Sequence, residues 1–145
     1  MKPIHFLAAC VVSCFLFTGC TEPSETSEDV QSETTSSIPP ETPVLINPTD
    51  RSEFNIFPRD MVFEWEAHPD ESVLYHFEVE YSWNQSDAFG IWGPGNSRNL
   101  VREMVQGNTY RLTFVGAQPG RWRVKAENQA GASGWSAWSY FRHRR

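Results

Sequence analysis

Two stretches near the C-terminus are the most informative about the fold: Arg121-Trp122-Arg123-Val124-Lys125-Ala126 and Gly134-Trp135-Ser136-Ala137-Trp138-Ser139. The first alternates basic and apolar residues, which is the period of two that is typical of a half-buried β-strand. The second has two tryptophans three residues apart. Such residues share a face in a polyproline-II conformation, which has three residues per turn, but they do not share a face in a flat strand. The two stretches therefore predict neighbouring strands of one β-sandwich.

These residues also predict a ladder of cations and indoles on one sheet. Alternate residues of a strand share a face at steps of about 6.6 Å, and tryptophans three apart in an extended turn stand about 9 Å apart. Planar cations fit between or beside such rings, and each exposed contact stabilises by about 0.5–1 kcal/mol. The predicted ladder residues are Arg121, Arg123, Lys125, Trp135 and Trp138. The ladder either stiffens the sheet or presents an aromatic and basic binding surface, and we favour the first interpretation.

The same period of two occurs earlier in the chain. Apolar and polar residues alternate in the segments 62–67, 75–83 and 110–114, and clusters of turn residues separate them. Glu78 and Glu80 lie on the outward face of the second segment, where they can form ion pairs with the ladder cations. No segment has a sustained helical period, so the sequence predicts an all-β protein.

The order of these pieces resembles a fibronectin type III domain from Pro43 to Phe141. The matching residues are Pro43 in the leading segment, Trp65 in the second strand, Tyr75 in the third, and Tyr110–Asn128 as a strand, turn and strand. The resemblance implies an immunoglobulin-like (fibronectin type III) β-sandwich of about seven strands.

The stretch Trp135–Ser139 matches the WSXWS motif of the class I cytokine receptors, which also lies in a fibronectin type III domain. Receptor function does not follow, because this chain has one predicted domain and a bacterial-type lipid signal. Two residues depart from the fibronectin type III pattern. Ala117 stands at the usual turn leucine, and Trp122 stands at the tyrosine that usually braces the corner.

Residues 1–19 have the pattern of a signal peptide, in which a basic start precedes a run of roughly 14 mostly apolar residues. That run is shorter than the roughly 20 residues of a membrane-spanning helix. Phe17-Thr18-Gly19-Cys20 resembles a bacterial lipobox, the signal for cysteine acylation, although the family usually has leucine at the first position. Cys10 and Cys14 also fit the pattern, but only Cys20 is followed by polar chain. An ordinary secreted protein is the alternative.

Residues 20–42 predict a disordered tether, and residues 43–145 predict the folded domain. The tether is rich in Ser, Thr and Pro and contains no Lys or Arg. Its acidic residues are Glu22, Glu25, Glu28, Asp29, Glu33 and Glu41. The domain keeps 12 of the 18 acids against 11 of the 12 Lys and Arg, because Lys2 is in the signal peptide. A nearly neutral domain gives no support to nucleic-acid binding.

The residue types of the domain predict no catalytic, metal or cofactor site. No cysteine follows Cys20, which excludes disulfides, thiolate metal ligands and a cysteine nucleophile from the domain. His68, His76 and His143 have no metal-ligand spacing, and we expect each of them on the surface. No G-x-S-x-G motif or phosphate-binding loop is present. We therefore expect no enzyme and no cofactor.

The best candidate for recognition is the long segment Ser86–Asn99, which mixes aromatic residues with glycine and proline. Loops of more than about 12 residues are often functional, and exposed aromatic side chains are typical anchors for partners. The candidate binding residues are Phe89, Ile91, Trp92 and Arg98. In the alternative interpretation the segment is an irregular edge strand whose aromatic side chains fold back onto the core.

Together these features predict a lipid-anchored protein of the bacterial cell envelope, in the outer membrane if the cell has two membranes. Cys20 attaches the protein to the membrane, and the single module binds or scaffolds a protein partner. The alternative is a glycan-binding β-sandwich in which Trp92, Phe89 or Trp83 stack on sugar rings. We expect clustered, coplanar, exposed rings in the glycan case, and scattered or buried rings in the protein case.

Overall fold

The computed structural model describes residues 37–55, 60–114 and 116–144. These residues form nine β-strands in two sheets and contain no helix. The smaller sheet has the order β1-β3-β6, and its strands are β1 (Leu45–Asn47), β3 (Asp60–Trp65) and β6 (Thr109–Thr113).

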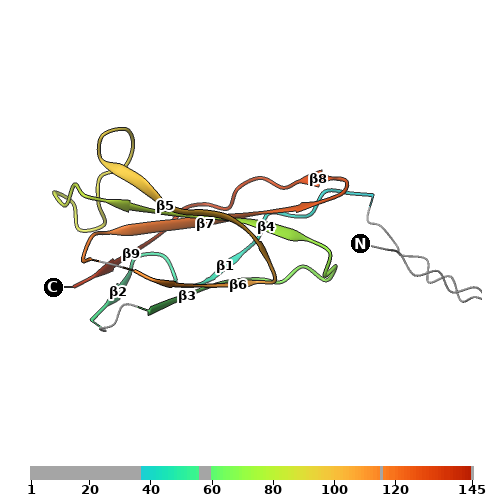
Figure 1. The fold of residues 1–145 in the computed structure, drawn as a ribbon, viewed down its shortest axis with the longest axis horizontal. Helices are drawn as coiled ribbons and strands as arrows, with labels where there is room; N and C mark the ends of the chain where they lie inside the picture. The colour runs from blue at the N-terminus through green and yellow to red at the C-terminus, as the bar shows by residue number, and fades with distance from the viewer. Residues whose placement is uncertain (1–36, 56–59, 115, 145) are drawn as a thin grey trace, which may run out of the picture. The chain divides into compact units, whose positions relative to one another are not determined.

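The larger sheet has the order β2-β9-β7-β4-β5, with the short β8 beside β7. Its strands are β2 (Ser52–Phe54), β4 (Leu74–Ser82), β5 (Ser97–Gln106), β7 (Gly120–Asn128), β8 (Gly131–Ala132) and β9 (Ser139–His143). Figure 1 shows two layers, with β4, β5 and β7 above β1, β3 and β6. The predicted all-β sandwich is confirmed, and the short β2 and β8 are additions to its seven main strands.

Three predicted features fall outside the described residues: the signal peptide 1–19, Cys20 and most of the tether 20–42. Within the described ranges, no helix is long and apolar enough to cross a membrane. The chain before β1 lies beside the turn between β7 and β8, where Asn128 donates a hydrogen bond to the Ile38 carbonyl at 2.9 Å.

Aromatic side chains fill the space between the sheets. Alternation along β3, β4 and β7 sends every second side chain inward, and Phe63, Phe77 and Trp122 are fully buried. The ring of Phe63 makes edge-to-face contacts at 5.1 Å with Phe77 and 5.2 Å with Trp122. The Trp122 indole N–H has no acceptor within the described residues, so the corner hydrogen bond of the family's tyrosine is not replaced there. Burial of such large apolar groups stabilises a sandwich without disulfides.

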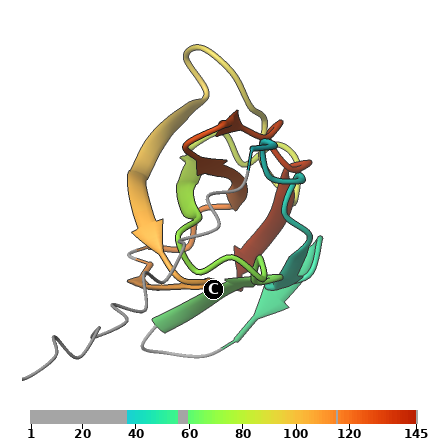
Figure 2. The same ribbon diagram turned by 90° about the vertical axis from the view of Figure 1, so that its right-hand side faces the viewer.

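The sequence pattern does not predict the strand β5. The predicted loop extended to Asn99, whereas β5 begins at Ser97 and continues to Gln106. Figure 2 shows this strand, coloured yellow to orange, at the outer edge of the larger sheet next to β4. Because most side chains on both faces of this edge strand are exposed, its sequence has no apolar alternation to reveal it.

Candidate functional site

Six side chains form one continuous stack on the outer face of the larger sheet. In order along the stack they are Trp92, Arg121, Trp138, Arg123, Trp135 and Lys125, and we call this set the Trp–Arg ladder. The guanidinium carbon of Arg121 lies 4.5 Å from the ring centroid of Trp92 and 4.0 Å from that of Trp138. The carbon of Arg123 lies 4.2 Å from Trp138 and 4.3 Å from Trp135. The structure thus brings the five predicted ladder residues together and adds Trp92.

Two serines hold the tryptophan segment beside β7. Ser136 donates its N–H to the Val124 carbonyl at 2.8 Å, and its hydroxyl oxygen accepts the Val124 N–H at 3.1 Å. Ser133 makes the same pair of bonds with Ala126, at 2.8 and 2.9 Å. These bonds satisfy the edge of β7 where no regular strand is present. They place both indoles of the motif over the outward cations of β7.

Carboxylates of β4, the neighbouring strand of β7, form ion pairs with the ladder arginines. β4 and β7 pair antiparallel, with Glu78 opposite Arg123 and Glu80 opposite Arg121. Arg121 donates to Glu80 at 2.7 and 2.9 Å, and Arg123 donates to Glu78 at 2.6 and 2.7 Å. The ion pairs expected of Glu78 and Glu80 are therefore present, and each guanidinium contacts a carboxylate as well as two rings.

Glu78 is a fully buried carboxylate that links β5 to the ladder. Arg102 and Asn99 of β5 donate to one carboxylate oxygen, and Arg123 donates to the other. Burial alone would raise the pKa of Glu78, but the hydrogen bonds from Arg102, Arg123 and Asn99 outweigh it and hold the pKa below its ordinary value. Glu78 is thus ionised at neutral pH.

The segment between β4 and β5 folds back onto the domain. The ring of Trp92 packs against Tyr140 at 5.8 Å, and its indole N–H donates to the Phe89 carbonyl at 3.0 Å. The buried Ser82 hydroxyl donates to the Ile91 carbonyl at 2.7 Å. This arrangement corresponds to the interpretation in which the aromatic side chains of the segment pack on the domain.

The other three candidate binding residues lie in different surroundings. Phe89 lies between Arg51 and Arg142, whose guanidinium carbons are each 5.3 Å from its ring centroid. Ile91 is 39% exposed, and Arg98 is the second residue of β5. The four candidate residues therefore do not form one aromatic surface.

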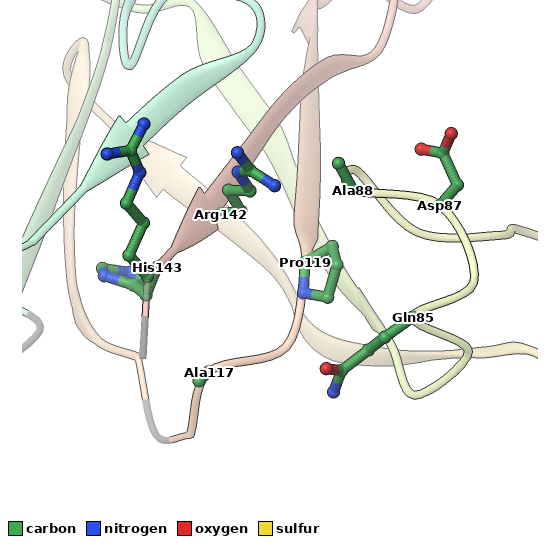
Figure 3. A pocket seen from close by; sticks show the side chains of 8 residues that line it. Gln85, Asp87, Ala88, Ala117, Pro119, Arg142 and His143 are labelled. Atoms are coloured by element: carbon green, nitrogen blue, oxygen red, sulfur yellow. The ribbon is translucent and has the colours of Figure 1, made fainter.

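An open hollow of about 350 Å³ lies between the C-terminal end of β9 and the segment that follows β4. Its lining residues are Gln85, Asp87, Ala88, Ala117, Pro119, Arg142, His143 and Arg144. Figure 3 shows Gln85 and Asp87 across the hollow from His143. Arg142 and Arg144 both form ion pairs with Glu53, which offsets much of their charge. The hollow offers polar contacts, but its lining shows no nucleophile hydrogen-bonded to a base.

The three histidines of the domain make separate contacts. His76 pairs with Glu127, and the Nδ1 atom of His68 accepts the Asp70 N–H at 3.0 Å. The expectation that His143 lies on the surface is wrong, because inward alternation along β9 continues through this position and buries the side chain. In the part of the chain that the structure describes, no three His, Cys, Asp or Glu side chains gather as a metal site.

β5 forms a free edge of the larger sheet. Among the described residues it pairs with β4 alone, whereas β4 and β7 have neighbours on both sides. The side chains of Leu100 and Met104 are 41% and 55% exposed along this edge. The unpaired backbone groups of an edge strand can accept a further strand.

No family model and no curated protein matches this sequence. Among solved structures, the chain is similar to the fibronectin type III domain of human fibronectin type III domain containing protein 3, with a TM-score of 0.44 and 14% identity. That match covers 76% of this chain and 91% of the human chain. A crystal structure of the chicken CNTN1 FN1-FN3 domains has a TM-score of 0.41 and 16% identity. This second match covers 72% of this chain and 35% of the chicken chain.

The domain is a fibronectin type III-like β-sandwich. Its strand order is the reason: a three-stranded sheet, β1-β3-β6, faces a sheet whose main strands have the order β9-β7-β4-β5. Within this sandwich the Trp–Arg ladder lies on the outer face of β7, and the free edge of β5 lies two strands away.

Proposed function

We propose that this chain is a lipid-anchored protein of the bacterial cell envelope that displays a single fibronectin type III-like module for protein–protein interaction or scaffolding. The segment Phe17–Cys20 supports the anchor because it resembles a lipobox and is followed by polar chain. Two acyl chains on Cys20 give stable attachment where one chain is marginal. If the cell has two membranes, the protein lies in the outer membrane, because Thr21 differs from the aspartate that signals inner-membrane retention.

The free edge of β5 is the observation that carries the binding role. A ten-residue edge strand presents a row of unpaired N–H and C=O groups, to which an extended polypeptide can add as a further strand. The exposed side chains of Leu100 and Met104 on β5 provide apolar contacts for the side chains of the added strand. Backbone pairing of this kind recognises a polypeptide, so the partner is an extended segment of a protein.

The aromatic side chains support a protein partner better than a glycan. Phe89 and Trp92 contact arginines of the domain itself. Trp83 is 44% exposed, but Arg98 lies over its ring at 5.5 Å, and the ring is inclined by 66° to that of Tyr81. An arginine lies over each of these three rings, and the Trp83 ring is inclined to its neighbour, whereas we expected exposed and coplanar rings in the glycan case.

A lysine on the edge of β5 tests the binding role. The substitution Leu100→Lys puts a charge in the path of an added strand, at an exposed position where effects on folding are small. The full chain is cross-linked in its cells and then extracted together with the envelope proteins bound to it. We expect the Leu100→Lys chain to capture much less envelope protein than the wild type. The control Ile46→Lys changes a side chain that is 42% exposed on β1, and it should capture as much as the wild type. Capture that is equal in all three proteins would remove β5 from the proposal.

A further inference from the structure

Two charged side chains on β5 lack an oppositely charged partner within the described residues. Arg98 contacts the Trp83 ring, and Glu103 accepts the Tyr110 hydroxyl at 3.1 Å. Charges on the core-side face of an edge strand discourage pairing with unrelated strands. They also select a strand whose charges have the complementary order.

Pairing with β4 shows which face each residue of β5 occupies, because directly opposed residues of an antiparallel pair share a face. The core-side residues, opposite Tyr81, Val79, Phe77 and Tyr75, are Arg98, Val101, Glu103 and Val105. The outer residues, opposite Ser82, Glu80, Glu78 and His76, are Ser97, Asn99, Arg102 and Met104. A bulge at Leu100 separates the two halves of the strand, and it shifts the alternation by one residue.

We propose that β5 pairs antiparallel with β5 of a second copy of this chain, in the register that places Arg98 opposite Glu103 of the second copy. The twofold symmetry of the pair forms this ion pair twice. The same register places Asn99 opposite Arg102 and Ser97 opposite Met104, so that outer residues face outer residues. Arg98 and Glu103 share a face only because the bulge lies between them. Without the bulge, two residues five positions apart would lie on opposite faces.

This inference rests on the proposed function, because it names the partner of the same β5 edge. A pair of ten-residue strands buries less surface than the roughly 1,200 Å² of a standard stable complex. We therefore expect weak pairing in solution and stronger pairing between copies that are concentrated on one membrane. The 22 residues between Cys20 and Pro43 reach roughly 70 Å when extended. That reach exceeds the roughly 33 Å length of β5, so two antiparallel modules can be anchored in the same membrane.

Single cysteines test the register, because no cysteine follows Cys20 in the native chain. The twofold axis passes between Leu100 and Val101, so the two Leu100 Cα atoms would stand about 6 Å apart, within reach of a disulfide. The two Met104 positions would stand roughly 24 Å apart. We expect oxidation of cell envelopes to yield a disulfide dimer with Leu100→Cys. The more exposed Met104→Cys and the native chain should yield none.

Exchanging the charges of Arg98 and Glu103 in the Leu100→Cys protein tests the proposed ion pair between the two copies. Adding Arg98→Glu should lower the disulfide-linked fraction about fivefold, because two attractive pairs become repulsive. Adding Glu103→Arg as well should restore it, since each pair is then reversed. Dimers that form equally at positions 100 and 104, or a double exchange that does not restore the Leu100→Cys dimer, would overturn the inference.

The outcomes also separate this inference from the proposed function. If Leu100→Cys forms no dimer while Leu100→Lys still abolishes capture of a different envelope protein, self-pairing is wrong and the binding role of β5 stands. If Leu100→Cys forms no dimer and Leu100→Lys leaves capture unchanged, both the self-pairing and the binding role of β5 are wrong.

Discussion

At the scale of single residues, the carboxylate of Glu78 joins three strands. It lies on β4 and accepts hydrogen bonds from Arg123 of β7 and from Arg102 and Asn99 of β5. A buried carboxylate is costly unless its charge is paired and hydrogen-bonded, and removal of one partner then destabilises the fold strongly. Glu78 therefore links the ladder to the free edge of the sheet.

We expect Glu78→Gln to lower the free energy of unfolding at pH 7 by about 3 kcal/mol, because two arginines would then face a neutral amide. The pKa of Glu78 is lowered in the folded protein, so the unfolded state binds more protons in the acid range. This contribution to stability is complete above about pH 4.5 and is lost as the pH falls through the folded pKa. Urea unfolding across acid pH measures both effects.

The control for this prediction is Glu71→Gln, which changes an exposed carboxylate and should leave the unfolding curve nearly unchanged. The wild type and the control should lose more stability than Glu78→Gln between neutral pH and pH 3. Identical pH profiles in all three proteins would show that the charge of Glu78 does not support the fold.

Trp138 is the ladder residue with arginines on two sides, 4.0 and 4.2 Å from its ring. If the ladder stiffens the sheet, Trp138→Ala should lower the free energy of unfolding by about 2 kcal/mol, because two cation–π contacts are lost. Trp83→Ala is the matched control, since Trp83 contacts one arginine at 5.5 Å and is more exposed. A Trp138→Ala protein with full stability but reduced partner capture would instead assign the ladder to binding.

At the scale of elements, the ladder connects segments that are distant in the sequence. β7 supplies the cations, the chain after β8 supplies two indoles, and the segment between β4 and β5 supplies Trp92. The ladder therefore ties that long segment to the sheet, in addition to hydrogen bonds such as those from Ser82 and from the Ile91 N–H. This role follows from the contacts of Trp92 with Arg121 and Tyr140.

We expect Trp92→Ala to release the segment between β4 and β5 locally. Amide hydrogen exchange in residues 88–95 should become about fivefold faster, because a cation–π contact and a ring contact no longer hold the segment closed. Ile91→Ala removes an exposed neighbour and serves as the control. Exchange rates that are equal in the two variants would show that the backbone bonds of this segment, and not Trp92, hold it in place.

At the scale of the whole molecule, we propose that the nearly neutral module is held at the membrane by Cys20 through an acidic tether. Mass spectrometry of the membrane-extracted protein should show a mature N-terminus at Cys20 that carries acyl chains. The Cys20→Ser protein should be recovered in the soluble fraction, because the hydrocarbon that holds it in the bilayer is missing. An unmodified wild-type product in the soluble fraction would contradict the anchor.

The alternation of β3, β4 and β7 was sufficient to predict an all-β sandwich, and the spacing of Arg121, Arg123, Trp135 and Trp138 was sufficient to predict which residues meet in the ladder. These patterns are local, because a strand with one buried face alternates and an Arg or Lys cation, at the end of its side chain, reaches only nearby rings on the same face. β5 was not predictable in this way, since most of its side chains on both faces are exposed. His143 was misplaced because the end of β9 is defined by its parallel partner β2, which is distant in the sequence.

The amino-acid sequence is sufficient to predict the fold class, the absence of thiols from the domain, and the ladder residues on β7 and its neighbouring segment. Three features became visible only in the three-dimensional arrangement of the described residues. Trp92 joins the ladder, β5 forms a free edge of its sheet, and Arg98 and Glu103 share a face. The reason is that these features depend on which strands become neighbours and on a bulge that shifts the alternation by one residue. Contacts between distant segments are set by packing of the whole domain, whereas periodicity records only the burial of each strand.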